Sequence, residues 1–191
     1  MNYILASASP RRRELLALAG FCFDVRVSDV EEIVLPGQSA DSNARNLAIQ
    51  KAEAVAADYP NNCVIAADTI VVLDDVILGK PADEADAARM LRLLSGREHR
   101  VITGVCIAYK GTRRVFSQET LVRFYPLRDD EIRAYVKTGE PMDKAGAYGI
   151  QGKGALLAEG IAGDYFNVVG LPIARLAREL HSLEPEGFAD G

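Results

Sequence analysis

The chain has 191 residues, of which 49% are apolar and 26% are charged, and its formal net charge is −5. This length and composition suit one sizeable α/β domain or two small lobes, and they argue against a disordered chain. The excess of acidic residues disfavours non-specific nucleic-acid binding, which needs clustered Lys and Arg, but it is compatible with a small phosphorylated ligand.

The cysteines and histidines predict neither a disulfide framework nor a zinc site. Cys22, Cys63 and Cys106 are widely spaced, and only His99 and His181 accompany them. We expect three small buried hydrophobic residues in a reducing compartment. No apolar run approaches the about 20 residues that span a membrane, and the order of the N-terminal residues is wrong for a signal peptide. We therefore expect a cytoplasmic protein that binds neither membrane nor nucleic acid.

Strands and helices follow one another in the first third of the chain. Ser9-Pro10 is a typical N-cap and first-turn proline, and Gly20 a typical stop, so they predict a helix over residues 11–19. Strands are expected over residues 3–6 and 21–27. An acidic loop and a turn at Pro36-Gly37 then lead into a second helix over residues 41–57.

The rest of the chain reads as a mixed sheet with helices. Residues 63–73 are almost continuously apolar, as in a strand covered on both faces. Further elements are expected in chain order: a hairpin turn at Asp74-Asp75, a strand over 76–78, a helix over 83–94, strands over 100–109 and 115–125, a helix from about 129 to 138, an extended glycine-rich loop over 140–154, a strand over 155–157 and a helix over 172–183. A tail from residue 184 should be frayed. Without a strict βαβ rhythm, these elements predict an α/β fold with a mixed sheet.

The segment from Ser7 to Arg13 lies between a strand and a helix. A helix start offers unpaired N–H groups and a positive dipole end, which together stabilise an anion, and arginine binds phosphate with two parallel hydrogen bonds. Arginines in a first turn oppose the dipole, so without an anion they cost some stability. The structural alternative is an ordinary capped helix with solvated arginines.

Lys51 and Asp68 are charged residues in apolar surroundings. At about 100° per residue, Lys51 falls inside the apolar arc of its helix. Its ammonium must reach water at the edge of the core or meet an anion such as phosphate. Asp68 interrupts a strongly apolar strand, so its charge needs a partner, a metal ion or backbone N–H groups. A functional Asp68 would orient or deprotonate water, or hold Mg²⁺.

Three further segments carry candidate residues. Lys80 lies on a turn in Gly79-Lys80-Pro81, where it is either a phosphate ligand or a surface charge. Glu31 and Glu32 lie in the acidic loop; if they are not simply solvated, Glu32 and Asp68 would hold a divalent metal. The glycine-rich residues 143–152 let the backbone approach a ligand, and Gln151 offers a donor and an acceptor to a uracil or thymine edge. The alternative for this segment is a surface loop.

Together these segments resemble the Maf family of nucleotide pyrophosphatases. The resemblance extends over nearly the whole chain, and the order of the motifs is specific. It rests on SASPRRREL at residues 7–15, the Glu31-Glu32 loop, Lys51, AADTIVVLDDVILGKP at 66–81, the stretch 95–105 with HRVITGV, DKAGAYGIQG at 143–152 and NVVGLP at 167–172. Ala8 stands where relatives often have glycine, which leaves slightly less room beside the phosphates.

The resemblance implies a fold, an assembly and a reaction. The fold would be the elongated mixed-sheet architecture shared with inosine triphosphatase-like enzymes, with two lobes and a cleft between them, and residues 1–191 would form a single Maf-like domain. Homodimers are usual in the family. The reaction would be hydrolysis of a nucleoside triphosphate to the monophosphate and pyrophosphate, supported by Mg²⁺ or Mn²⁺.

Residue roles follow from matching motif positions. Asp68 would be the proton acceptor and Glu32 would help with the metal or the water, while phosphates would be bound by Ser7, Arg12, Lys51 and Lys80. Base preference would be set by Arg11, Thr69 and Gln151, and this form is similar to the branch acting on dTTP and UTP. Two alternatives stay open: a triphosphatase for modified bases, and a nucleotide-binding regulator of cell division or septum formation, against which Asp68 counts.

Overall fold

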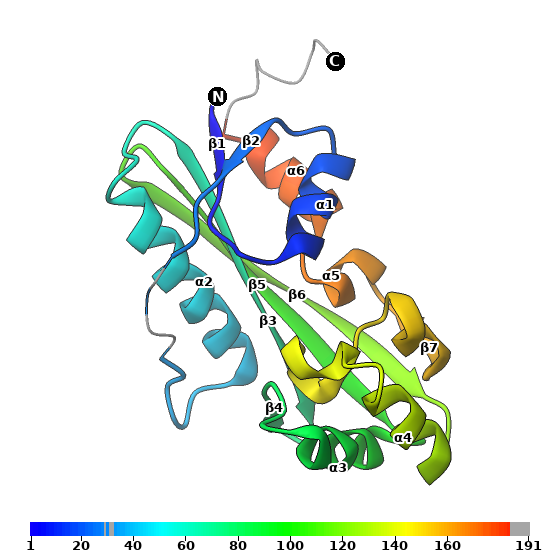
Figure 1. Ribbon diagram of the computed structural model, residues 1–191. Coiled ribbons are helices and arrows are strands. Elements are labelled where there is room, and N and C mark those ends of the chain that lie inside the picture. Colours follow the sequence, from blue (N-terminus) through cyan, green and yellow to red (C-terminus); the bar gives the residue numbers. More distant parts are fainter. Residues whose placement is uncertain (29, 31–32, 184–191) are drawn as a thin grey trace. The chain divides into compact units, whose positions relative to one another are not determined.

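The computed structural model describes residues 1–28, 30 and 33–183 (Figure 1). The strands are β1 Tyr3–Leu5, β2 Phe23–Val25, β3 Cys63–Leu73, β4 Val76–Leu78, β5 Glu98–Tyr109, β6 Thr112–Phe124 and β7 Ala158–Ala162. The α-helices are α1 Pro10–Leu18, α2 Ala40–Ala56, α3 Glu84–Leu94, α4 Asp129–Val136, α5 Tyr165–Val169 and α6 Ile173–His181. Within the described residues there are also the 3₁₀ helices η1 Glu140–Asp143, η2 Ala145–Ala147 and η3 Gly152–Leu156.

The strands form one mixed sheet, as the sequence predicts. Their order is β2-β1-β3-β5-β6-β7, and β4 pairs with β3. β1 runs parallel to both β2 and β3, whereas β4 and β7 are antiparallel to their neighbours. Across the described residues, no helix combines the length and the apolarity that a membrane crossing requires.

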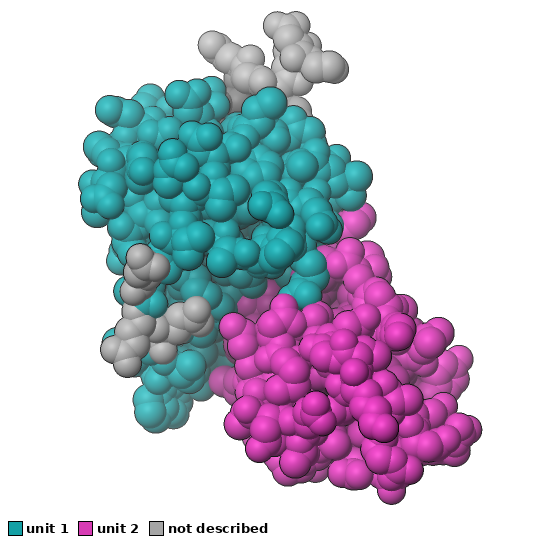
Figure 2. Space-filling view, in the orientation of Figure 1, with its two compact units in different colours: residues 1–68, 103–118, 170–191 teal, residues 69–102, 119–169 magenta. Residues whose placement is uncertain are grey.

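The chain divides into two compact units, shown in different colours in Figure 2. Unit 1 comprises residues 1–68, 103–118 and 170–191, and unit 2 comprises residues 69–102 and 119–169. The division agrees with the expectation of two lobes. The expected cleft and the expectation of a single domain stay predictions, and the tail from residue 184 lies outside the described residues.

The core of unit 1 explains why α2 lies close to the sheet. Alternate residues of the strands, such as Ile4 and Val64, pack against Ala48 and Ala52 of α2. Figure 1 shows α1 and α6 on the other side of these strands. Gly104 permits the close approach of α2, because a Cβ atom there would lie only 2.3 Å from the carbonyl carbon of Ala44.

Most expected elements are confirmed, but the chain after residue 140 differs from expectation. The expected extended loop is a series of 3₁₀ helices, and the strand expected at residues 155–157 is wrong. Those residues lie at the end of η3, and the strand is β7, which pairs with β6 through residues 158–162. This segment has little intrinsic strand preference, so pairing with a long neighbouring strand decides its structure. Helix α5 was not anticipated.

A buried aromatic cluster organises unit 2. His99 of β5 is 2% exposed and shares a hydrogen bond of 2.8 Å between its Nε2 and the hydroxyl of Tyr148. Phe124 packs edge-on against both rings. Among the described residues, the Nδ1 atom of His99 is buried without a hydrogen-bond partner. Burial lowers the pKa of His99 from 6.5 to about 4, so the fold holds a neutral imidazole.

We predict that His99 makes the protein less stable in mild acid. Between pH 6.5 and 4 the His99 imidazole binds a proton in the unfolded chain but stays neutral in the folded chain. The free energy of unfolding therefore falls as the pH drops. The expected loss from pH 7 to pH 5 is about 2 kcal/mol, to be measured by urea unfolding at both pH values. His99→Gln should remove this part of the pH dependence, and the matched change of the exposed His181→Gln should not. Equal pH dependence in wild type and His99→Gln would contradict the prediction.

Candidate active site

The loop after β1 and the first turn of α1 bring Ser7 and Arg12 together. Ser9 caps α1 by accepting the Arg12 N–H at 3.4 Å, as its position before Pro10 predicts. The buried Ser7 hydroxyl accepts from the backbone N–H of Ser9 at 3.2 Å and from the Arg12 guanidinium at 3.4 Å. This arrangement turns the arginine back toward the start of its own helix.

Arg12 is also held from the far end of the sequence. Its Nε donates a 2.9 Å hydrogen bond to the carbonyl oxygen of Gly170, just before α6. A guanidinium offers several donors in a fixed plane, so a bond at Nε fixes the direction in which the other nitrogens point. The alternative of a solvated arginine is therefore wrong for Arg12, which is partly buried and oriented by hydrogen bonds to Gly170 and Ser7.

Lys51 and Asp68 form a largely buried ion pair. The Lys51 Nζ lies 2.5 Å from Asp68 Oδ1, and the two side chains are 12% and 11% exposed. Lys51 shares the buried stripe of α2 with Leu47, Ala48 and Val55. The helical arc in the sequence predicts this placement, and each residue supplies the countercharge that the apolar position of the other requires.

Strand register puts Ser7 and Asp68 just beyond the carboxyl end of the paired segment of β1 and β3. β1 and β3 are parallel with Leu5 opposite Ile65, and the N–H of Ala6 donates to the Ile65 carbonyl at 2.8 Å. Ser7 and Asp68 therefore both follow the carboxyl ends of this paired segment. β2 and β3 flank β1 on opposite sides, and in open α/β sheets ligands bind beside the carboxyl ends of strands at such a reversal of strand order. The first unit thus gathers Ser7, Arg12, Lys51 and Asp68.

Unit 2 contains Thr69, Lys80 and Gln151. Thr69 directly follows Asp68 in β3 and is half-buried, whereas Lys80 and Gln151 are exposed. The turn that carries Lys80 contacts the glycine-rich segment, because the Gly146 N–H donates to the Gly79 carbonyl at 3.0 Å. Gly146 is required there, since a Cβ would lie 2.9 Å from Cγ1 of Val71.

The roles predicted for Arg11 and Glu32 stay predictions, like those of the other site residues. Arg11 lies half-buried in the first turn of α1, and its role in base preference stays a prediction. Glu32 lies outside the described residues, so its metal role also stays a prediction. Within the ranges that the structure describes, no group of three or more His, Cys, Asp and Glu side chains is placed to hold a metal ion.

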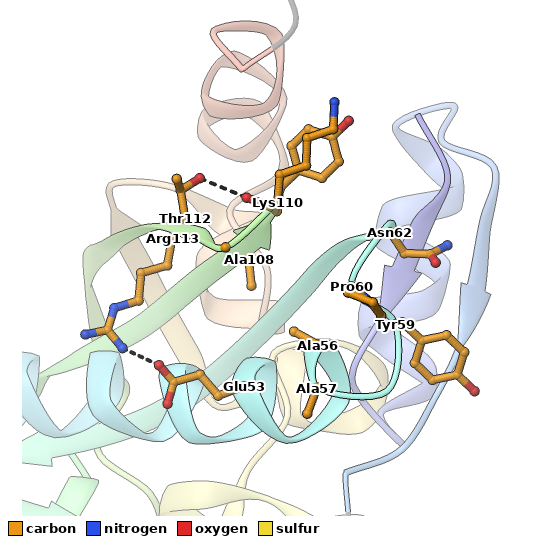
Figure 3. Close-up of a pocket in the computed structure, with 12 residues that line it drawn as sticks. Glu53, Ala56, Ala57, Tyr59, Pro60, Asn62, Ala108, Lys110, Thr112 and Arg113 are labelled. Carbon is orange, nitrogen blue, oxygen red and sulfur yellow. Dashed lines mark hydrogen bonds and ion pairs between the residues drawn. The ribbon is translucent and has the colours of Figure 1, made fainter.

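A pocket of about 440 Å³ in unit 1 does not contain the predicted residues (Figure 3). It lies between the C-terminal end of α2 and the turn from β5 to β6, and Tyr59, Asn62 and Lys110 line it. Asn62 precedes β3 directly, so this pocket is at the opposite end of the strand segment from Asp68, about 20 Å away at about 3.3 Å per residue. Figure 3 shows Arg113 paired with Glu53 at its side.

Several supporting residues were missed by sequence reasoning. Arg12 is held by the backbone carbonyl of Gly170, and the side chains of Tyr135 and Glu140 accept backbone N–H groups of the glycine-rich loop over 140–154. The Tyr135 hydroxyl accepts from the Gly149 N–H at 3.1 Å, next to Tyr148 of the aromatic cluster. Of these supporting residues, only Gly170 lies in a motif that the sequence singled out, NVVGLP at 167–172. The motif does not show that the Gly170 carbonyl contacts Arg12.

We predict that Lys51 and Asp68 are energetically coupled. Lys51→Met should lower the free energy of unfolding by about 1–3 kcal/mol, because it leaves a buried carboxylate without its countercharge. Adding Asp68→Asn should restore part of the loss, so urea unfolding of both single variants and the double variant should give a coupling above about 0.5 kcal/mol. Breaking the exposed pair by Arg113→Met is the control, with an expected change below about 1 kcal/mol. Strictly additive effects at Lys51 and Asp68 would refute the coupling.

Two named bacterial proteins are similar to this chain over nearly its whole length. A dTTP/UTP pyrophosphatase of Koribacter versatilis (strain Ellin345) is 56% identical over 178 residues, which cover 93% of this chain and 92% of that protein. A dTTP/UTP pyrophosphatase of Bacillus mycoides (strain KBAB4) is 52% identical over 183 residues, which cover 96% of each chain.

A solved structure supports the fold assignment. The structure of a HAM1 protein from Coxiella burnetii aligns with a TM-score of 0.52 and 15% identity, over 95% of this chain and 99% of that one. This likeness confirms the expected mixed-sheet fold class. The family model for Maf-like proteins matches residues 2–183, so the chain belongs to the Maf family.

Proposed function

We propose that this protein hydrolyses dTTP and UTP to the monophosphate and pyrophosphate. One structural observation supports the proposal above the others: a largely buried lysine–aspartate pair lies beyond the carboxyl end of β1, as do a serine and an oriented arginine. Cations that bind a polyphosphate and a carboxylate that receives a proton are the groups this reaction requires. The names of the close relatives supply the two nucleotides.

Ser7, Arg12 and Lys51 would bind the phosphates. Arg12 would donate to phosphate oxygens while Gly170 holds its Nε, and Ser7 would donate its hydroxyl proton to another oxygen. The triphosphate would compete with Asp68 for the Lys51 ammonium, so substrate binding would release the carboxylate for chemistry. Lys80 would bind phosphate as well, as its place in the family motif implies.

Asp68 would accept the proton of the attacking water. The water oxygen would form a bond to the α-phosphorus as its proton passes to the Asp68 carboxylate, and the bond from the α-phosphorus to the bridging oxygen would break. The electron pair of that bond would leave with pyrophosphate, and the monophosphate would keep the new oxygen. Positioning and charge compensation contribute most of the rate in such reactions.

The donor chemistry of Asp68 is compatible with a divalent metal. Mg²⁺ is held in many sites by one or two carboxylates together with substrate phosphates and water, and the 11% exposed Asp68 side chain supplies such an oxygen ligand. Asp68 and Glu32 would hold Mg²⁺ or Mn²⁺. When bound, the ion would compensate phosphate charge and make water more acidic.

Base preference would depend on Thr69, Gln151 and Arg11. Gln151 presents both an acceptor and a donor, which matches the edge shared by uracil and thymine. This proposal leaves modified pyrimidine nucleotides as further substrates, and a panel of triphosphates distinguishes them from dTTP and UTP. We further expect a homodimer in the cytoplasm.

The direct test is to incubate the purified protein with each triphosphate and Mg²⁺ and to identify the products. Monophosphate and pyrophosphate from dTTP and UTP, with slower turnover of the other nucleotides, are the expected result, and chelation of the metal should abolish it. Binding of nucleotide without any turnover would favour the regulator of cell division or septum formation instead.

We predict that Asp68→Asn lowers kcat by at least about a hundredfold, because the amide keeps the shape of the carboxylate but cannot accept the proton. The measurement is pyrophosphate release from dTTP at saturating substrate, after thermal unfolding has shown that the variant is folded. Asp75→Asn, at an exposed hairpin carboxylate paired with Arg100, is the matched control and should keep wild-type kcat. Near wild-type turnover of folded Asp68→Asn would remove Asp68 from the mechanism.

A further inference from the structure

The Glu140 side chain in unit 2 accepts two consecutive backbone N–H groups. Its Oε1 lies 3.1 Å from the nitrogen of Lys153, and its Oε2 lies 3.3 Å from the nitrogen of Gly154. Both nitrogens belong to the first turn of η3. Charge-assisted hydrogen bonds of this kind are stronger than neutral ones. Glu140, at the start of η1, therefore fixes where η3 begins.

Gln151 is the residue whose position this arrangement determines. It is the N-cap of η3 and has an extended backbone with φ −86° and ψ 165°. The side chain of an N-cap residue normally satisfies the first N–H groups of the helix itself. Gln151 makes no such capping hydrogen bond and is exposed. Glu140 takes over the capping, so the Gln151 amide is not engaged in it.

Close packing of the segment shows that its backbone has little room to shift. Gly152 has a φ of +66°, and a Cβ atom there would lie 2.8 Å from Oε1 of Glu140. A Cβ atom on Gly154 would lie 2.0 Å from the carbonyl oxygen of Gly149. The Lys144 ammonium binds the Glu140 carbonyl at 2.5 Å, which holds the backbone of Glu140 as well.

We propose that Glu140 is a positioning residue that sets base preference by fixing the backbone on which Gln151 is presented. This inference rests on the proposed function and on the proposed role of Gln151. Reading a base edge requires a donor and an acceptor at fixed positions, and a displacement of about 1 Å can cost a large factor in rate. Without the carboxylate, η3 loses both acceptors and Gln151 loses its defined direction.

The test compares kcat and KM for dTTP, UTP, CTP and ATP in wild type and Glu140→Gln. The amide keeps the size of the side chain, but its NH₂ group faces a backbone N–H that needs an acceptor. We expect kcat/KM for dTTP and UTP to fall about tenfold, mainly through KM, and that for ATP to change less than about twofold. Glu159→Gln removes an equal charge from a surface ion pair with Arg123 in the same unit and should leave all four values unchanged.

Two further measurements separate positioning from general damage. Hydrogen exchange should show at least one of the Lys153 and Gly154 amides exchanging at least about tenfold faster in Glu140→Gln, because the glutamine oxygen can accept only one of the two N–H groups, with unchanged protection in β3. In a Gln151→Ala background, Glu140→Gln should change base preference less than about twofold, because its effect acts through Gln151. The shorter Glu140→Asp, which keeps the charge, provides the same comparison if Glu140→Gln does not fold.

Wild-type kinetics distinguish the two possible failures. If the wild type does not hydrolyse dTTP and UTP in preference to ATP, the proposed function fails. If the wild type has this preference and Glu140→Gln either keeps it or loses activity equally on all four nucleotides, the role of Glu140 is refuted and the proposed function stands. Unchanged exchange of the Lys153 and Gly154 amides would also refute it.

Discussion

The ion pair of Lys51 and Asp68 is the constraint on which the site in unit 1 depends. Each charge occupies a position that burial would otherwise forbid, one on the apolar stripe of α2 and one in an apolar strand. Replacing both by apolar residues would leave packing intact and often preserves or raises stability. A lysine and an aspartate that are buried together beyond the carboxyl end of β1 therefore have a better explanation in function than in stability.

The pair also explains how an apolar helix face can deliver a cation to a substrate. Alanines dominate the contact between α2 and the sheet. Gly104 lets the helix come close, because a side chain there would collide with the backbone of Ala44. Because the helix lies close, the Lys51 side chain reaches Asp68 from within the packed stripe. A polyphosphate bound beside Asp68 would offer the Lys51 ammonium several anionic oxygens in place of one carboxylate. The lysine would therefore have a countercharge both before and after substrate binds.

The sequence was sufficient for elements that local chemistry determines. The strand over Cys63–Leu73 has the expected bounds, because an apolar run ends there at the turn of Asp74 and Asp75, and α1 starts at its predicted cap. The arc of α2 placed Lys51 correctly but left its partner open, and Asp68 was a separate candidate. Residues after 140 were harder, because β7 depends on pairing with β6 and the 3₁₀ helices depend on hydrogen bonds to distant side chains.

The site residues that the sequence revealed are oriented by backbone groups that it did not reveal. Arg12 is held by the carbonyl of Gly170, and the turn before Lys80 by the N–H of Gly146. Gln151 is likewise oriented by backbone groups, because the N–H groups of Lys153 and Gly154, which follow it, donate to the Glu140 carboxylate. A motif identifies a side chain by its type, whereas a backbone donor or acceptor exists at nearly every residue and carries no label. In the sequence, a glycine can indicate such a contact, because a close approach of the backbone leaves no room for a Cβ atom. Gly146 and Gly154 therefore mark such contacts, because a Cβ atom at either would lie within 3 Å of a neighbouring atom, whereas Gly79 has open space at its Cβ position.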